Sequence, residues 1–367
     1  MLGGATISIV RLVSLLEDRG WRFVFWTPRP SQLHDELRDR GLEVYGAPRH
    51  IAYSLRALRL PPGAAAGLRS VPPYLRRLIR LIRESRPSLV HANSVLSLAE
   101  AATARTMGVP TLLHVHEMIA PSRKGALQRR AAHLVADELV GVSSACAQAL
   151  ELPGWSPRIV NECAPVSADP AHGSADGRFV VGTVGVISQR KGTDLFVEAA
   201  RIVRERRPEI EFELIGGLTD VLDVDWGRGV LARAAELGIR HRERADVAAA
   251  LAGWDAFVLP SRRDPFPISM LEAMGSGLAV VGTAVDGLRE QITPESGILT
   301  PPEDPRSLAE AVIRLRDDPA LRAGLGAAAR RRVAEHFSLE RQAEGIDRAY
   351  ESAIARGGSG RLRRRSS

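Results

Sequence analysis

Residues 260–281 read PSRRDPFPISMLEAMGSGLAVV, and this stretch decides the fold and the position of the site. It follows an apolar strand candidate at residues 256–259 and runs into another at residues 278–282. Two carboxylates, Asp264 and Glu272, lie eight positions apart, separated by a turn rich in proline and by the start of an expected helix. In open α/β sheets, ligands bind beyond the carboxyl ends of parallel strands. The stretch therefore predicts a ligand site on an α/β fold.

The same residues resemble the donor-sugar signature of retaining glycosyltransferase family 4 (glycosyl transferases group 1). That signature has a strand ending in Pro-Ser, a Glu-x7-Glu pair, then Glu-Ala, a small residue and Gly; here the pair is Asp264 and Glu272. Residues 286–290, DGLRE, look like the family's Gly-Gly-x-x-Glu turn with Asp286 at the first glycine, and residues 297–304 continue the likeness. The resemblance implies the GT-B fold, in which two Rossmann-like, doubly wound α/β domains face a central cleft.

Length and composition are compatible with that expectation. The chain has 367 residues, of which 45% are hydrophobic, enough for two domains with full cores. No apolar run reaches the roughly 20 residues that span a bilayer, we see no signal peptide, and two cysteines are too few for a disulfide framework. We therefore expect a cytoplasmic protein. The net charge of +7 favours an anionic membrane surface or an anionic donor, and no nucleic-acid motif accompanies it.

Apolar strand candidates alternate with helix-length segments along the whole chain, which is typical of parallel βαβ units. We expect an acceptor-side N-terminal domain at residues 1–168, a nucleotide-sugar donor domain at 169–338, and a polar linker near the boundary. The resemblance implies that a C-terminal helix at 339–355 packs back on the N-terminal domain. The basic residues 356–367 predict a disordered tail. In relatives a first strand precedes the loop that Gly3 and Gly4 resemble, so we expect that strand to be missing from the N-terminal domain.

Residues 180–193 predict a diphosphate site. They form an apolar strand, a loop with glycines and two cations, and the start of a helix, and loop amides with a helix N-terminus bind anions. Gly185, Lys191 and Gly192 match the family's pattern, whereas Val186 stands where the family often has an arginine. We expect Arg190 to substitute for that arginine; the alternative is a surface turn with solvated charges.

The resemblance also assigns roles around the carboxylate pair. Glu272 corresponds to the glutamate that accepts hydrogen bonds from the ribose hydroxyls, and Asp264 to the one that contacts the donor sugar beside the leaving phosphate. A helix N-terminal acid remains the alternative for Glu272, and Asp264, whose side chain is one methylene shorter than glutamate, retains the alternative of no role in the site. Backbone amides of Phe266, Pro267, Ile268 and Ser269 should face sugar hydroxyls, except that Pro267 has no amide hydrogen. Gly4 would bring backbone close to the diphosphate.

In the N-terminal domain, His116 ends a strand and aligns with the family histidine that approaches the reacting sugar from the acceptor side. A neutral imidazole can hydrogen-bond a hydroxyl without adding fixed charge. His114 is a competing choice two residues away, and His91 with Asn93 ends the preceding strand in a structural or acceptor-side role.

Residues 74–84, YLRRLIRLIRE, have apolar residues at helical spacing and four arginines. They predict either a helix that lies on anionic lipid or a helix that flanks the sheet with solvated arginines. The acidic pair Asp223 and Asp225 has no strand before it and is expected to lie in a loop. We expect no metal and no cofactor, because GT-B enzymes usually need no divalent ion.

The sequence thus predicts a hexosyl-type retaining glycosyltransferase with His116 and Asp264 as catalytic residues. It would move a sugar from a nucleotide-sugar donor to an acceptor hydroxyl of a glycan, a glycolipid or a small molecule, by attack on the same face. We expect it to be peripheral on the inner membrane face. A catalytically weak partner subunit and a nucleotide-sugar 2-epimerase, which shares the fold, are the alternatives.

Overall fold

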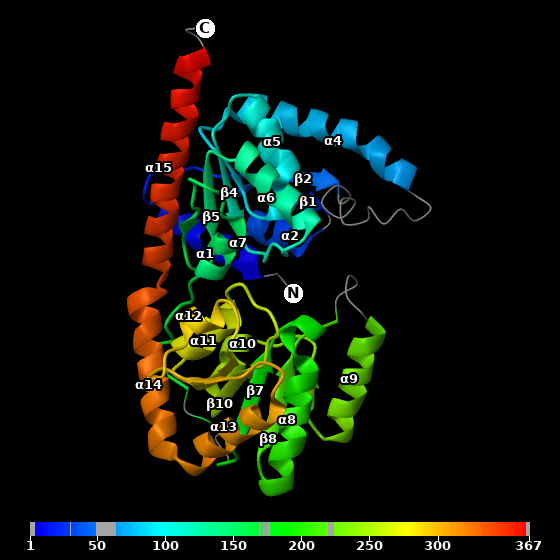
Figure 1. Cartoon of the computed structure of the whole chain (residues 1–367), viewed down its shortest axis with the longest axis vertical. Coiled ribbons are helices and arrows are strands. Elements are labelled where there is room, and N and C mark those ends of the chain that lie inside the picture. Colours follow the sequence, from blue (N-terminus) through cyan, green and yellow to red (C-terminus); the bar gives the residue numbers. More distant parts are fainter. Residues whose placement is uncertain are drawn as a thin grey trace. The chain divides into compact units, whose positions relative to one another are not determined.

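The computed structural model describes residues 4–29, 31–48, 64–168, 170–171, 173, 177–218 and 224–364. The chain divides into two compact units (Figure 1). Residues Asn161–Arg341 make up the C-terminal unit, and Leu2–Val160 together with Gln342–Ser367 make up the N-terminal unit. Each unit is an α/β structure with parallel sheets, as the GT-B fold requires.

The C-terminal unit is built on a six-stranded parallel sheet in the order β12-β11-β10-β7-β8-β9. This order is that of a doubly wound fold. Successive strands are added outward from β7 toward one edge of the sheet and then outward from β10 toward the other edge, so the switch point lies between β7 and β10. Because both faces are covered, the central strands are apolar and buried along their whole length. The strands are β7 (Val180–Val184), β8 (Glu211–Ile215), β9 (Arg240–Arg242), β10 (Ala256–Leu259), β11 (Ala279–Thr283) and β12 (Ile298–Thr300).

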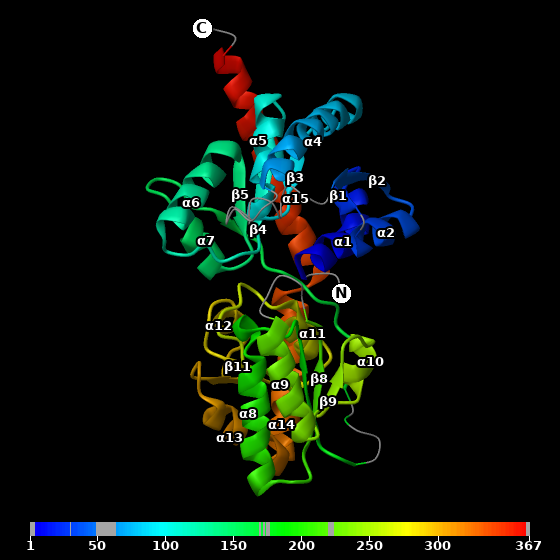
Figure 2. The ribbon, with the colours of Figure 1, turned by 90° about the vertical axis from the view of Figure 1, so that its right-hand side faces the viewer.

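Helices cover both faces of this sheet (Figure 2). On one face, the first, second and sixth helices of the unit bury apolar residues in a single core with the strands. On the other face, α11 packs against β10 and α14. The helices are α8 (Thr193–Arg206), α9 (Val224–Glu236), α10 (Val247–Ala252), α11 (Ile268–Gly275), α12 (Leu288–Gln291), α13 (Pro305–Asp317) and α14 (Pro319–His336).

The sheet of the N-terminal unit is in two parts among the described residues. One is a parallel pair, β1 (Val24–Arg29) and β2 (Glu43–Pro48); the other is a four-stranded parallel sheet in the order β3-β4-β5-β6. Figure 2 shows the pair to one side of the four-stranded sheet. The four strands are β3 (Val90–Ala92), β4 (Thr111–Val115), β5 (Glu138–Gly141) and β6 (Arg158–Ile159).

The helices of the N-terminal unit are α1 (Gly4–Glu17), α2 (Gln32–Asp39), α4 (Ala64–Ser85), α5 (Leu98–Thr106), α6 (Arg123–Val135), α7 (Ser144–Leu150) and the long α15 (Leu339–Arg364). In α4 the apolar residues Tyr74, Leu78 and Ile82 are buried in a small core that includes Ala47 of β2 and Ala104 of α5. Arg76, Arg77, Arg80 and Arg83 of α4 are exposed. The apolar side of residues 74–84 therefore packs inward, as expected for a helix that flanks the sheet.

The expected disordered tail at residues 356–367 differs from the structure, in which α15 continues to Arg364. The physical reason lies in contacts just past residue 355. The Arg356 guanidinium forms an ion pair with Glu138 at 2.9 Å and lies 6.0 Å from the ring of Trp155, and Gly357 lies against Pro110. A tail judged by composition alone does not reveal such anchoring.

The expected domain boundary after residue 168 lies further along the chain than the boundary between the units, which falls at residue 160. Part of the polar segment read as a linker packs on the C-terminal unit instead. The Ala164 amide donates to the Phe337 carbonyl at 3.2 Å, and the Ser167 amide donates to the Gly275 carbonyl at 3.1 Å. Backbone hydrogen bonds, which composition does not encode, tie this segment down.

The acidic pair near residue 224 is also corrected. Asp225 lies in the first turn of α9, not in a loop, while Asp223 falls outside the described residues. Negative charge in a first helical turn is favoured by the helix dipole. Within the described residues, no group of His, Cys, Asp and Glu is arranged to hold a metal ion, and no helix is long and apolar enough to cross a membrane.

Candidate functional site

The candidate site lies at the carboxyl ends of β7 and β10, at the switch point where the strand order of the C-terminal unit reverses. Two loops meet there: residues 185–192 between β7 and α8, and residues 260–267 between β10 and α11. The backbone amides of Arg262 and Arg263 donate to the carbonyl of Arg190, at 2.9 and 3.4 Å. The two stretches that the sequence singled out separately therefore form one surface.

A compact charge cluster brings three predicted residues together. The Lys191 ammonium donates to Asp264 Oδ2 at 2.7 Å, and the Arg190 guanidinium lies 3.7 Å from Asp264 Oδ1. Ser261 donates its hydroxyl to the same Asp264 Oδ2 at 3.1 Å. The carboxylate is almost fully buried, whereas half of Arg190 faces solvent. A buried carboxylate requires such compensation, because burying an unpaired charge is costly.

Asp286 fixes the loop that carries Asp264. Its Oδ2 accepts hydrogen bonds from the Asp264 amide at 2.9 Å and from Arg263 Nε at 3.0 Å. The Gly287 amide donates back to the Asp264 carbonyl at 3.1 Å. Asp286 has a φ of +35°, a conformation that favours glycine. A glycine would adopt this φ without strain, whereas the aspartate contributes the two hydrogen bonds that hold the Asp264 loop.

The start of α11 forms the next part of the surface. Pro267 is its N-cap and provides no side-chain cap for the helix amides, so the first-turn amides of Ile268 and Ser269 are available to a ligand. Phe266 contributes only backbone, because its ring is buried against Phe337 with centroids 5.5 Å apart. Glu272 is half-buried one turn further along α11.

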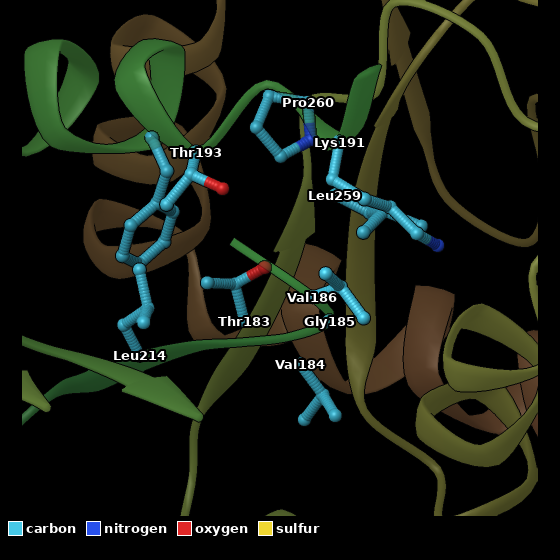
Figure 3. A pocket seen from close by; sticks show the side chains of 10 residues that line it. Thr183, Val184, Gly185, Val186, Lys191, Thr193, Leu214, Leu259 and Pro260 are labelled. Atoms are coloured by element: carbon cyan, nitrogen blue, oxygen red, sulfur yellow. The ribbon is translucent and has the colours of Figure 1, made fainter. Parts of the chain in front are cut away.

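A small pocket adjoins the cluster beneath the β7–α8 loop (Figure 3). It is lined by Gly185, Val186, Lys191 and residues of β7, α8 and β10. The side chain of Lys191 runs along Gly185. A Cβ added to Gly185 would stand 3.6 Å from Lys191 Cδ. In Figure 3 the ammonium end points away from Thr183 and Thr193, toward the side where Asp264 binds it.

Gly192 holds the two loops in close approach. It has a φ of +67°, and a Cβ there would stand 2.0 Å from the Pro260 carbonyl oxygen. Only glycine meets both demands. Its position directly before Thr193, the first residue of α8, leaves that helix without a side-chain cap.

The remaining predicted residues belong to the N-terminal unit. His116 directly follows β4, is half-buried, and its Nε2 lies 2.8 Å from Asn93 Oδ1, which follows β3. Gly4 is the first residue of α1. His116 therefore stands at a strand end, as predicted, and is held in place by a residue from the neighbouring strand end.

His114, the competing choice, is buried within β4, and its ring lies tilted by 43° against that of His116 with centroids 4.2 Å apart. Burial and the neighbouring imidazoles hold the pKa of His114 well below its usual range. Burial also lowers the pKa of His91 to about 3, and its Nδ1 lies 2.8 Å from the Tyr350 hydroxyl of α15. Both are neutral; His114 is buried, whereas His91 and His116 are half-buried.

Three polar residues beside the predicted positions are not predicted from the sequence. Ser261 and Gln291 were not singled out, although Gln291 Nε2 donates to the Pro267 carbonyl at 3.1 Å from a fully buried position. Glu117 was also missed; it accepts hydrogen bonds from the Val95 and His116 amides at 3.2 Å each. The available signal was position, since each of these polar residues is adjacent to a predicted motif in the sequence or follows a predicted strand.

Comparisons with known proteins match both units. A family model described as "Glycosyl transferases group 1" matches residues 178–318, and one described as "Glycosyl transferase 4-like domain" matches residues 3–160. The structure is similar to that of HepE from Anabaena, solved in complex with UDP and glucose, with a TM-score of 0.80, 18% identity, and coverage of 95% of this chain and 96% of that one. At this identity the likeness shows the fold alone.

Two curated relatives each match about half of the chain. A D-inositol 3-phosphate glycosyltransferase of Arthrobacter sp. (strain FB24) is 32% identical over 185 residues, which cover 48% of this chain and 44% of the relative. The lipopolysaccharide core biosynthesis mannosyltransferase LpsB of Rhizobium meliloti is 28% identical over 195 residues, covering 51% and 55%. The matches thus span about half the length of these relatives. Since the two family models cover both units and the fold agrees, the chain belongs to the group 1 glycosyltransferases, with a family 4-like N-terminal domain and the GT-B fold.

Proposed function

We propose that the protein transfers a sugar from a nucleotide-sugar donor to an acceptor hydroxyl with retention of anomeric configuration. The observation that carries the proposal is the cluster of Arg190, Lys191 and Asp264 at the switch point of the sheet. Group 1 membership and the named relatives support the same class of reaction.

The charge balance of the cluster suits a diphosphate. Arg190, Lys191 and Arg263 carry three positive charges, and Asp264 and Asp286 carry two negative ones. One positive charge therefore remains, beside the uncapped N-termini of α8 and α11. Helix N-termini and a cation together favour binding of phosphate groups.

We assign the other donor contacts by position. Glu272 accepts from the ribose hydroxyls with its two carboxylate oxygens, and Asp264 accepts from a hydroxyl of the donor sugar. The Gly185 backbone and the amides of Ile268 and Ser269 lie against the diphosphate and the sugar. In the N-terminal unit, Gly4 adds backbone near the diphosphate.

The proposed reaction needs no protein nucleophile. The bond between the sugar C1 and the diphosphate oxygen breaks, and a bond from C1 to the acceptor oxygen forms on the same face. The acceptor proton passes to the departing diphosphate, whose charge is stabilised by Lys191 and Arg190. His116 as a neutral imidazole hydrogen-bonds the acceptor or the sugar.

We further propose that the reaction needs no metal and no cofactor besides the donor, because the two cations and the helix amides supply the charge compensation that a divalent ion provides elsewhere. A hydrolysis or transfer assay with excess chelator tests this. Turnover should be unchanged; a loss that magnesium restores would contradict it. The acceptor is a glycan, glycolipid or small molecule, and we place the enzyme in the cytoplasm at the inner membrane face.

The first experiment is a thermal-shift titration with UDP, GDP, ADP and their sugars. We expect one nucleotide series to stabilise the protein, and Lys191→Ala and Glu272→Ala to lose the effect. Lys124→Ala is the matched control for the first variant, since Lys124 is the other lysine of the chain and lies exposed on α6 of the other unit. Glu310→Ala on the exposed side of α13 is the control for the second.

Turnover is measured next with the stabilising nucleotide sugar. Slow hydrolysis of the donor without acceptor, lost in Lys191→Ala and Asp264→Ala, would support the transferase. Selective binding with no hydrolysis and no transfer to any acceptor would indicate a catalytically weak partner subunit. Release of free 2-epimer would indicate the epimerase instead.

A further inference from the structure

Helix α6 presents two leucines to solvent. Leu127 and Leu134 are 68% and 74% exposed, more than the other large apolar side chains in the described part of the chain. They lie seven positions apart, which is close to two helical turns, so both lie on one side of the helix. An exposed pair of this kind is not required by the fold.

The opposite side of α6 is the one that holds the helix in place. Gly125, Ala132 and Val135 are buried, and a Cβ on Gly125 would stand 2.0 Å from the Ala120 carbonyl oxygen. The helix packs through this side on α5. The inner side is therefore close-packed by small residues, and the leucines contribute nothing to that packing.

The exposed side of α6 also carries positive charge. The 13 residues of the helix include four arginines and lysines and no acid. Arg130 lies between the two leucines, and Arg123 and Lys124 lie at the first turn; all three are exposed. Within the described residues, none of the three forms an ion pair. We name Arg123, Lys124, Leu127, Arg130 and Leu134 the outer face of α6.

We propose that the outer face of α6 docks on an anionic lipid bilayer. The leucines would enter the boundary between headgroups and acyl chains, and the three cations would lie among the headgroup phosphates. Leucines and cations on one face, without acids, are the composition of helices that lie in the membrane interface. A protein interface is the weaker fit, because the centre of such interfaces is depleted in charge and enriched in aromatic residues, and the outer face has no aromatic residue.

Helix α4 of the same unit carries further cations. Helix α5 packs against both α4 and α6. Arg76, Arg77, Arg80 and Arg83 of α4 are exposed and form no ion pair within the described residues. The attraction to anionic lipid is therefore not limited to the three cations of α6.

The docking site rests on the proposed function in one respect only: a lipid-linked acceptor would reach the enzyme from the membrane on which α6 lies. Vesicle binding needs no donor, and donor hydrolysis needs no vesicles. Failure of either proposal is therefore visible while the other stands.

The test is flotation of the full chain with vesicles of phosphatidylcholine alone or with about 30% phosphatidylglycerol. We expect binding to the anionic vesicles, little binding to the neutral ones, and release at high salt. Leu127→Ser/Leu134→Ser and Arg123→Ala/Arg130→Ala should each weaken binding about tenfold or more. Arg314→Ala/Arg331→Ala, which removes the same charge from exposed positions of the C-terminal unit, is the matched control and should bind nearly as the unchanged protein does.

Thermal melts and donor hydrolysis without vesicles show that each variant is folded. Two results would overturn the proposal. One is an unchanged protein that binds no anionic vesicle, in which case the outer face serves a protein partner or none. The other is vesicle binding that the leucine and arginine variants on α6 leave intact, which would place the membrane contact elsewhere.

Discussion

Asp286 is the residue through which the C-terminal unit controls the position of Asp264. It combines a φ of +35° with two hydrogen bonds to the loop that carries the carboxylate. The conformation is unfavourable for a side chain with a Cβ, and the hydrogen bonds offset that cost. Substitutions of Asp286 can measure how far the hydrogen bonds offset the strain of the positive φ.

We expect Asp286→Ala to lower the free energy of unfolding by about 1 to 3 kcal/mol, because the hydrogen bonds are lost while the strained φ remains. We also expect weaker binding of the nucleotide sugar, since the Asp264 loop loses its support. Asp286→Gly should lose less stability, because glycine relieves the strain, yet still bind the donor more weakly. Denaturant melts and a donor titration check both. Donor binding unchanged in both variants would show that Asp286 does not position Asp264.

The buried histidines predict acid sensitivity. Burial lowers the pKa of His114 and His91, so both are neutral in the folded protein and charge only on unfolding. Stability is then fully present above the unfolded pKa of about 6.5. It is lost as the pH falls from there toward the folded pKa, by about 1.4 kcal/mol per pH unit for each histidine.

His114→Leu tests this, since both ring nitrogens of His114 are buried without a hydrogen-bond partner within the described residues. We expect a flatter stability profile between pH 7.5 and pH 5 than in the unchanged protein. The buried carboxyl of Glu100, whose pKa is raised by burial, affects both proteins alike and cancels in the comparison. His336→Gln, at a half-exposed side chain, is the control. Parallel profiles for His114→Leu and the unchanged protein would refute the assignment.

At the scale of elements, the β7–α8 loop depends on Gly192. Gly192→Ala places a Cβ against the Pro260 carbonyl at a φ of +67°, so β10 and the loop must move apart. We expect a loss of more than about 1 kcal/mol in stability and a weaker nucleotide-dependent shift. Gly229→Ala in α9, where a Cβ meets nothing within 4 Å, should be neutral or stabilising. Thermal melts of both variants with and without nucleotide decide; equal melts would argue against the close approach.

The same scale shows what the sequence can predict. The strand at residues 256–259 is predicted with its observed bounds, because buried parallel strands are continuous apolar runs. Strand β9 was missed, since Arg240, His241 and Arg242 are all exposed at the sheet edge and carry no apolar pattern. The pairing of Lys191 with Asp264 joins residues 73 positions apart; the sequence places them in separate motifs, and only the folded loops show the contact.

At the scale of the molecule, we expect two unfolding transitions, because the chain divides into two compact units. The cluster that we assign to the donor lies wholly in the C-terminal unit. A nucleotide at about 100 times its Kd should therefore raise the transition of that unit by a free energy of about 2.7 kcal/mol and shift the other much less. Scanning calorimetry with the nucleotide found in the thermal-shift panel measures this. A single transition, or an equal shift of both, would show that the units unfold as one.

The C-terminal unit is an insertion in the N-terminal one, because Gln342–Ser367 groups with Leu2–Val160. On the ribosome, the first unit must therefore wait for its last helix while the whole second unit is made. At about 5 to 20 residues per second this takes roughly 10 to 40 s. During that time the places of Tyr350 beside His91 and of Asp347 beside Trp21 are empty. The nascent chain thus carries an incomplete first unit until synthesis has passed residue 350.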